Sequence, residues 1–220
     1  MYTEPFLTLE NLNEKRLKWL EKLGAFNRPR PHLKLKHEKC ALVIVDMLQY
    51  FAKPEGRVFL PSTVAIVPEI SKLLKHWRSI GSTIVFTRHC HESKDDLGMM
   101  RKFFTDYIRC GEEDSEIIQE LSPLPGEKVI RKCTYDAFFE TDLDDFLINR
   151  SVKQVIVTGV LTQLCCETTA RSAFVRDYEV YIPVDALTTS TEELHLCSLM
   201  NLASGFAVMT DTDTVCPLDN

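Results

Sequence analysis

The sequence lacks the features that mark several large classes of protein. Its 220 residues contain no apolar run as long as a membrane span, and residues 1–6 do not have the basic-then-apolar order of a secretion signal. Basic clusters are also missing, and the net charge of −6 disfavours binding to a phosphate backbone. No Gly-x-Gly-x-x-Gly motif follows a predicted strand, which disfavours dinucleotide binding. We therefore expect a cytoplasmic protein with no nucleic-acid partner and no membrane partner.

The cysteines do not form a recognisable framework. There are eight of them, with no Cys-x-x-Cys pair and no zinc-ribbon spacing. Several lie inside apolar runs, where cysteine serves as a small hydrophobic residue. A cytosolic chain keeps its thiols reduced, so we expect the cysteines to be reduced and most of them to be core residues.

What the sequence does contain is an alternation of apolar, β-branched runs with helical segments. The runs predict strands at 40–45, 83–87, 128–131, 154–158, 179–184 and 206–209. Helical patterns occupy 61–80, 142–150, about 162–177 and 192–204, with a short helix near 115–121. Strands that are apolar throughout are typical of a parallel sheet covered by helices on both faces. Residues 39–220 are therefore predicted to form one α/β domain with a doubly wound parallel sheet.

An amphipathic segment precedes this domain. Leucines at 9, 12, 17, 20 and 23, together with Trp19, follow helical periodicity, and prolines after them predict an extended connector. Residues 1–38 are therefore expected to form an appended helix and connector. The apolar stripe of this helix packs either on its own domain or on a sister subunit.

Side chains that follow the strands are the candidates for an active site. In doubly wound folds the site lies beyond the carboxyl ends of the strands, where the strand order reverses. In chain order the candidates are Asp46, then Arg88, His89 and His91, then Lys132, then the turn from Gly159 to Cys165.

Two cysteines lie near the start of the helix that follows the fourth strand. We predict Thr162 as the N-cap, so both fall in the first turn, where free N–H groups and the helix dipole favour a thiolate. Cys166 shares a face with Ala170, Ala173 and Phe174, which suits packing on the sheet, whereas Cys165 shares its face with small polar residues. Cys165 is the predicted nucleophile and Cys166 a core residue. The alternative is that both are structural thiols.

Asp46 and Lys132 would complete a catalytic set with Cys165. Asp46 can accept the thiol proton and later give it to a leaving group. An adjacent Lys132 ammonium would hold Asp46 ionised by lowering its pKa. The alternatives are that Asp46 caps a turn and that Lys132 is a solvated surface charge.

Three segments resemble the isochorismatase-like cysteine hydrolases, a superfamily that includes nicotinamidases, N-carbamoylsarcosine amidohydrolases, ureidoacrylate amidohydrolases and isochorismatases. The segments are 46–51, 132–138 and 159–171, and they lie in the family's order within a resemblance that runs from about residue 39 to 209. The resemblance implies a six-stranded sheet of order 3-2-1-4-5-6 and a triad of Asp46, Lys132 and Cys165. It also implies that the family's usual dimers or tetramers are formed here, so a homodimer or homotetramer is expected.

The resemblance further implies a cis peptide bond between Val160 and Leu161. In that geometry the backbone N–H groups of Leu161 and Cys165 would face a developing oxyanion. The function expected is hydrolysis of a small amide, carbamoyl or ureido substrate through a thioester, with no cofactor. Isochorismatase-type vinyl-ether hydrolysis through Asp46, without the thiol, is one alternative, and a non-catalytic binding protein on the same fold is another.

The substrate pocket can be outlined only in part. Phe51, Tyr135 and Phe138 lie beside the triad in sequence, so we expect them to line the pocket with His91, and we expect Arg88 to hold a substrate carboxylate. Nicotinamidases of this superfamily carry an Asp-x-His metal cluster after the loop of the first strand. Residues 57–64 contain neither aspartate nor histidine, so no metal site is expected.

Overall fold

The computed structural model describes residues 2–27 and 30–216. Its six strands form one parallel sheet with the order β3-β2-β1-β4-β5-β6. The strands are β1 (Cys40–Val45), β2 (Ile84–His89), β3 (Lys128–Lys132), β4 (Gln154–Gly159), β5 (Glu179–Pro183) and β6 (Ala207–Thr210). The predicted fold class and strand order are confirmed.

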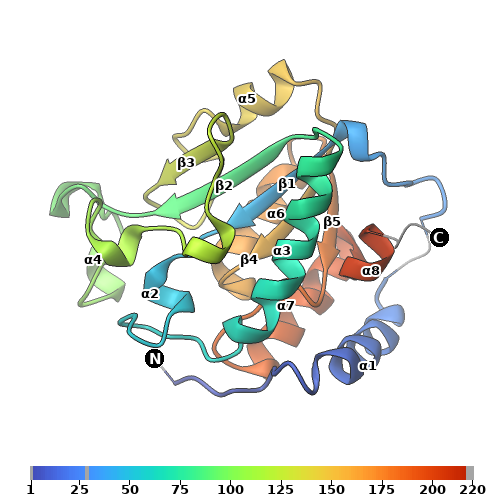
Figure 1. Cartoon of the computed structure of the whole chain (residues 1–220), viewed down its shortest axis with the longest axis horizontal. Coiled ribbons are helices and arrows are strands. Elements are labelled where there is room, and N and C mark those ends of the chain that lie inside the picture. Colours follow the sequence, from blue (N-terminus) through green and yellow to red (C-terminus); the bar gives the residue numbers. More distant parts are fainter. Residues whose placement is uncertain (1, 28–29, 217–220) are drawn as a thin grey trace.

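Helices cover both faces of this sheet, with α3 in front and α6 behind in the view of Figure 1. The α-helices are α1 (Leu12–Gly24), α2 (Gln49–Ala52), α3 (Thr63–Ser79), α4 (Met100–Phe103), α5 (Leu143–Asn149), α6 (Glu167–Phe174), α7 (Glu192–Gly205) and α8 (Thr212–Val215). Within the described ranges, none combines the length and apolar character needed to cross a bilayer.

The centre of the sheet positions the candidate site. Every residue of β1 is buried, which explains its uninterrupted apolar sequence. β1 pairs with β2 on one side and with β4 on the other, and Val45 is in register with Gly159. The residues that follow β1 and β4 therefore emerge side by side at the point where the strand order reverses.

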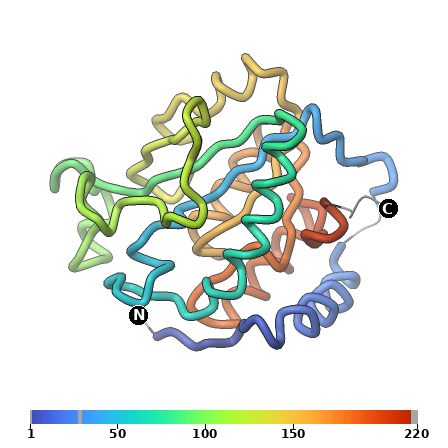
Figure 2. The backbone as a smooth tube through the Cα atoms, viewed as in Figure 1, coloured from blue at the N-terminus to red at the C-terminus, as the bar shows by residue number. Residues whose placement is uncertain are grey.

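The N-terminal helix packs on its own chain. Figure 2 shows the N-terminal segment running along one edge of the molecule beside C-terminal elements, and α1 contacts α7 and β6. Leu12, Trp19 and Leu23 are buried there, whereas Leu9 and Leu17 are exposed. The sequence left open whether this helix packs on its own domain or on a sister subunit. Most of its apolar stripe packs on its own domain.

The start of the helix after β4 differs from the prediction. A single π-helical turn, Thr162–Cys166, comes first, and α6 follows it and ends at Phe174. Thr162 is not an N-cap, because its hydroxyl is hydrogen-bonded to Nδ1 of His195 at 2.9 Å. Phe174 is exposed rather than packed on the sheet. The bond to a residue 33 positions away overrides the local capping signal.

Two further predictions need correction. The segment near 115–121 forms two short 3₁₀ turns, Glu113–Ser115 and Gln119–Leu121, in place of one helix. Cys90 and Cys110 form a disulfide, so the expectation of reduced cysteines is wrong for this pair. The pairing is brought about by a parallel bridge between His91 and Arg109, a tertiary contact with no local sequence signal. The six other cysteines are free.

Candidate active site

The carboxyl ends of β1, β3 and β4 bring Asp46, Lys132 and Cys165 together. Nζ of Lys132 lies 2.7 Å from Oδ2 of Asp46 and donates a hydrogen bond to Sγ of Cys165 at 3.2 Å. All three side chains are buried. An acid, a cation and a thiol in mutual contact are the components that a cysteine-based acyl transfer needs.

Asp46 is held in place by its own backbone and by the neighbouring strand. Its φ of 48° lies in the left-handed region, which aspartate adopts more readily than most residues. The hydroxyl of Thr87, on β2, accepts a hydrogen bond from the Asp46 N–H at 3.1 Å and donates one to Oδ1 at 2.6 Å. This leaves Oδ2 directed at Lys132.

Gly159 allows the turn that carries the thiol to leave β4 close to β1. Its φ is 104°, and a Cβ at this position would lie 2.1 Å from the carbonyl oxygen of Val45, so no other residue fits. The peptide bond between Val160 and Leu161 is cis, as the family resemblance implied. The π-helical turn that follows presents Cys165 to the pocket and buries Cys166 completely.

The charges of the three groups follow from burial and from their mutual contacts. Burial alone would raise the pKa of Asp46, but the Lys132 ammonium and the hydrogen bonds from Lys132 and Thr87 together hold that pKa below its usual value. The same pairing keeps the pKa of Lys132 above its usual range despite burial. For Cys165, burial raises the pKa to about 12, although Lys132 opposes the shift. At neutral pH the residue is therefore a thiol, so the start of the helix does not by itself make it a thiolate and a base such as Asp46 is needed.

Two histidines extend the site from Lys132 toward the surface. Nδ1 of His89 lies 3.4 Å from Nζ of Lys132, and the two Nε2 atoms of His89 and His91 are 3.2 Å apart. Nδ1 of His91 in turn contacts Asp96. Burial, reinforced by Lys132, lowers the pKa of His89 to about 3, so this ring is neutral. The alternation of the two histidines at the end of β2 was the sequence signal for this pair.

A pocket of about 450 Å³ opens in front of the thiol. Of the predicted residues, it contains Cys165, Leu161, Phe51, His91 and Tyr135. His89 and Leu164, which belong to the candidates that follow the strands, line it as well. The sequence did not indicate the rest of the wall: Tyr50, Val58, Met100, Phe104, Thr105, Asp106, Tyr107 and Ile108. None of the described side chains lining it is an arginine or a lysine. The pocket is therefore mainly aromatic and apolar.

Two predicted pocket residues lie elsewhere. Successive side chains of a strand point to opposite faces, so Arg88 faces away from His89 and forms an ion pair with Glu116 at 3.1 Å. Phe138 is buried and stacks on Tyr178, with ring centroids 6.0 Å apart. Neither residue lines the pocket. Position at the end of a strand was a poor guide for Arg88, and adjacency in sequence to the triad was a poor guide for Phe138.

The residues do not fit a metal ion of the kind that the family's nicotinamidases carry. Atoms of Asp46, His89 and Cys165 lie within 4.8 Å of one another, but the Lys132 ammonium contacts all three side chains and would repel a cation. A second group consists of His91, Asp96 and Cys133. The guanidinium of Arg131 lies 2.8 Å from Sγ of Cys133 and would likewise repel a cation there.

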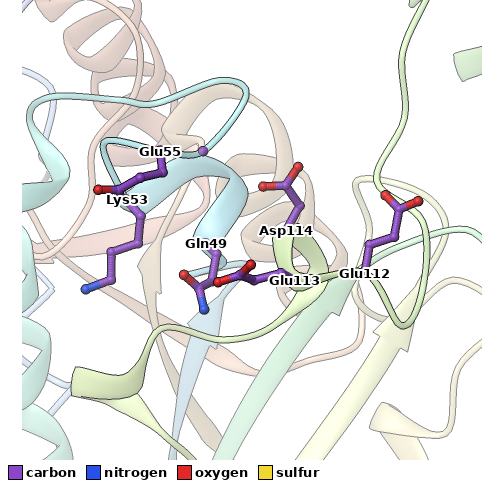
Figure 3. A pocket seen from close by; sticks show the side chains of 7 residues that line it. Gln49, Lys53, Glu55, Glu112, Glu113 and Asp114 are labelled. Atoms are coloured by element: carbon purple, nitrogen blue, oxygen red, sulfur yellow. The ribbon is translucent and has the colours of Figure 1, made fainter.

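Another hollow, of about 460 Å³, lies beside α2 (Figure 3). It is lined by Gln49, Lys53, Glu55, Gly56, Glu112, Glu113 and Asp114. Neither a thiol nor any other member of the triad is among these residues. The pocket that contains Cys165 is therefore the candidate active site.

The fold and this site define an enzyme-like α/β domain built around a buried Asp-Lys-Cys cluster, and the family follows from comparison. The Isochorismatase domain model matches residues 40–214, so the chain belongs to the isochorismatase family, as its motifs predicted.

The chain is similar to several hydrolases. Nicotinamidase 3 of Arabidopsis thaliana is 41% identical over 179 residues, which cover 79% of this chain and 85% of that protein. Ureidoacrylate amidohydrolase RutB of Pseudomonas syringae pv. syringae is 28% identical over 214 residues, covering 86% of each chain. A cysteine hydrolase structure from Pseudomonas syringae pv. phaseolicola superposes with a TM-score of 0.80 at 30% identity, covering 83% of this chain and 93% of the other.

Proposed function

We propose that this chain is a cysteine amidohydrolase that cleaves a small amide through a thioester. The observation that carries the proposal is the placement of Lys132 between Asp46 and Cys165, with the thiol at the wall of an open pocket. The names of the relatives, a nicotinamidase, a ureidoacrylate amidohydrolase and a cysteine hydrolase, support the same reaction class.

In the proposed mechanism Asp46 transfers one proton in each half of the reaction. Cys165 gives its proton to Asp46 as Sγ attacks the carbonyl carbon, and the backbone N–H groups of Leu161 and Cys165 stabilise the oxyanion. Asp46 then protonates the leaving nitrogen, the C–N bond breaks, and a thioester remains. Asp46 next takes a proton from water, which attacks the thioester, and the returning proton restores the thiol. Lys132 keeps Asp46 ionised between these steps.

The pocket favours a neutral, flat substrate within this class. Phe51, Tyr135 and Tyr107 supply aromatic surface, and the Asp106 carboxylate at the wall is already paired with Arg57 at 2.8 Å. A substrate carboxylate would meet no cationic partner among the lining side chains, since Arg88 is paired with Glu116 outside the pocket. An uncharged aromatic carboxamide such as nicotinamide therefore fits better than a ureido or carbamoyl acid. Nicotinamide would be bound here without a metal ion.

The test is ammonia release from nicotinamide, ureidoacrylate and an N-carbamoyl amino acid. We expect turnover of nicotinamide by the native protein and by Cys166→Ala, since Cys166 is buried behind the site, and none by Cys165→Ala. Turnover by Cys165→Ala would contradict the thiol mechanism and favour hydrolysis through Asp46 alone, as in vinyl-ether cleavage. Failure to release ammonia from any substrate would favour vinyl-ether cleavage or a binding role. Light scattering of the same samples tests the expected homodimer or homotetramer, and imaging of tagged protein tests the cytoplasmic location.

A further inference from the structure

The N-terminal segment lies outside the matched domain, yet it reaches the back of the active site. Trp19 of α1 is 2% exposed, and its ring packs on His195 of α7 with centroids 4.7 Å apart. Phe6 contacts the same histidine at 5.8 Å. Nε1 of Trp19 donates a hydrogen bond to Glu192 at 2.8 Å, in the first turn of α7. Residues from outside the matched domain therefore pack against the His195 ring and help to fix its orientation.

His195 passes this constraint to the turn that carries the thiol. Its Nδ1 is hydrogen-bonded to the Thr162 hydroxyl at 2.9 Å. The backbone of Thr162 is held as well, because its N–H donates to Thr188 at 3.0 Å and its carbonyl accepts from Ser198 at 3.2 Å. Thr162 is the first residue of the π-helical turn, and Cys165 is the fourth. Anchoring the first residue at three atoms fixes where Sγ lies relative to Lys132.

We propose that His195 and Thr162 are positioning residues for Cys165, and that the N-terminal segment controls the site by holding His195 through Trp19. The proposal rests on the proposed function in taking Cys165 as the nucleophile. His195 is completely buried, and burial lowers its pKa to about 3. The ring is therefore neutral throughout the physiological range, and its bond to Thr162 is expected to persist without titrating.

The first test removes only the Thr162 hydroxyl. Thr162→Val keeps the side-chain shape, so we expect kcat to fall about tenfold with KM within about twofold of wild type, because the thiol is misplaced while the pocket is intact. Thr162→Ser, which restores the hydroxyl, should recover most of kcat. An unchanged kcat in Thr162→Val, or an equal loss in the valine and serine variants, would contradict the positioning role.

The second test asks whether the N-terminal segment acts through this bond. Trp19→Leu should lower kcat by a similar factor, and the double variant with Thr162→Val should be no slower than Thr162→Val alone, since both changes loosen one turn. Trp77→Leu is the matched control. Trp77 of α3 is also buried, and it donates a hydrogen bond to the Cys40 carbonyl at the start of β1. The Trp77→Leu variant should therefore be less stable than the native protein but keep its kcat. Multiplicative losses in the double variant would overturn the coupling.

A readout that needs no substrate separates this proposal from the proposed function. The rate at which iodoacetamide modifies Cys165, located by peptide mass spectrometry, reports the placement of Sγ against Lys132. We expect it to change in Thr162→Val and Trp19→Leu but not in Trp77→Leu. If the native protein cleaves no amide, the proposed function fails while this comparison still stands. If the alkylation rates of all four proteins agree, the positioning role fails even when amidase activity is found.

Discussion

Asp46→Asn should separate the reactivity of the thiol from its ability to complete hydrolysis. In the native site Asp46 raises the pKa of Cys165 and Lys132 lowers it, while burial adds the largest upward shift. Replacing the carboxylate with an amide removes a negative charge that destabilises the thiolate and leaves the Lys132 ammonium 3.2 Å from Sγ. Two unit charges at that separation attract by about 5 kcal/mol at an effective dielectric constant of ~20.

That attraction acts in the native site as well, so the change in the variant is the loss of the upward shift from Asp46, and each unit of pKa corresponds to only about 1.4 kcal/mol. We therefore expect the pKa of Cys165 to fall by at least about one unit in Asp46→Asn. The same variant has no group to carry the proton to the leaving nitrogen, so kcat should fall by a factor of about 10² to 10⁴. The thiol becomes easier to alkylate while the enzyme becomes inactive.

The assay is the pH dependence of iodoacetamide modification at Cys165, alongside ammonia release. Asp185→Asn is the matched control, because Asp185 is also completely buried but bonds to Thr212, and it does not line the pocket. Its alkylation profile should match that of the native protein. An unchanged or upward-shifted profile in Asp46→Asn would refute the electrostatic reasoning. Near-native turnover would refute the role of Asp46 in proton transfer.

Two further predictions concern stability. Cys110→Ser opens the disulfide to Cys90, which closes a 20-residue separation, so the free energy of unfolding in urea should fall by about 3 kcal/mol. KM should rise because Tyr107 and Ile108 beside it line the pocket, and an unchanged KM would show that the wall is held by other contacts. Burial raises the pKa of Asp185 to about 6, so the native state binds the extra proton and stability falls as pH rises from 5 to 7. In urea unfolding, the free energy of unfolding of the native protein should fall by about 1 kcal/mol more than that of Asp185→Asn over that range. If the two proteins lose stability in parallel, Asp185 does not take up a proton on folding.

Most of the fold could be predicted because its signals are local. An apolar, β-branched run such as 40–45 is typical of a strand buried on both faces, and the turn at Gly159 tolerates no side chain. Segment boundaries were less predictable, as the π-helical turn before α6 shows. Thr162 has the composition of an N-cap, but a distant histidine bonds its hydroxyl instead. No pattern in residues 157–174 contains that information.

The strand order could be predicted through the family motifs, and so could the three residues that meet at the strand ends. Asp46 follows β1, Lys132 ends β3 and Cys165 lies in the turn after β4, and the topology of a parallel sheet brings these ends to one edge. The pocket wall, the disulfide and the protonation of the thiol could be learned only from the folded chain. These depend on which loops meet and how much water they exclude. Arg88 lies at the end of β2 and Phe138 ends the motif that begins at Lys132, yet strand alternation and a stack on Tyr178 place both side chains outside the pocket.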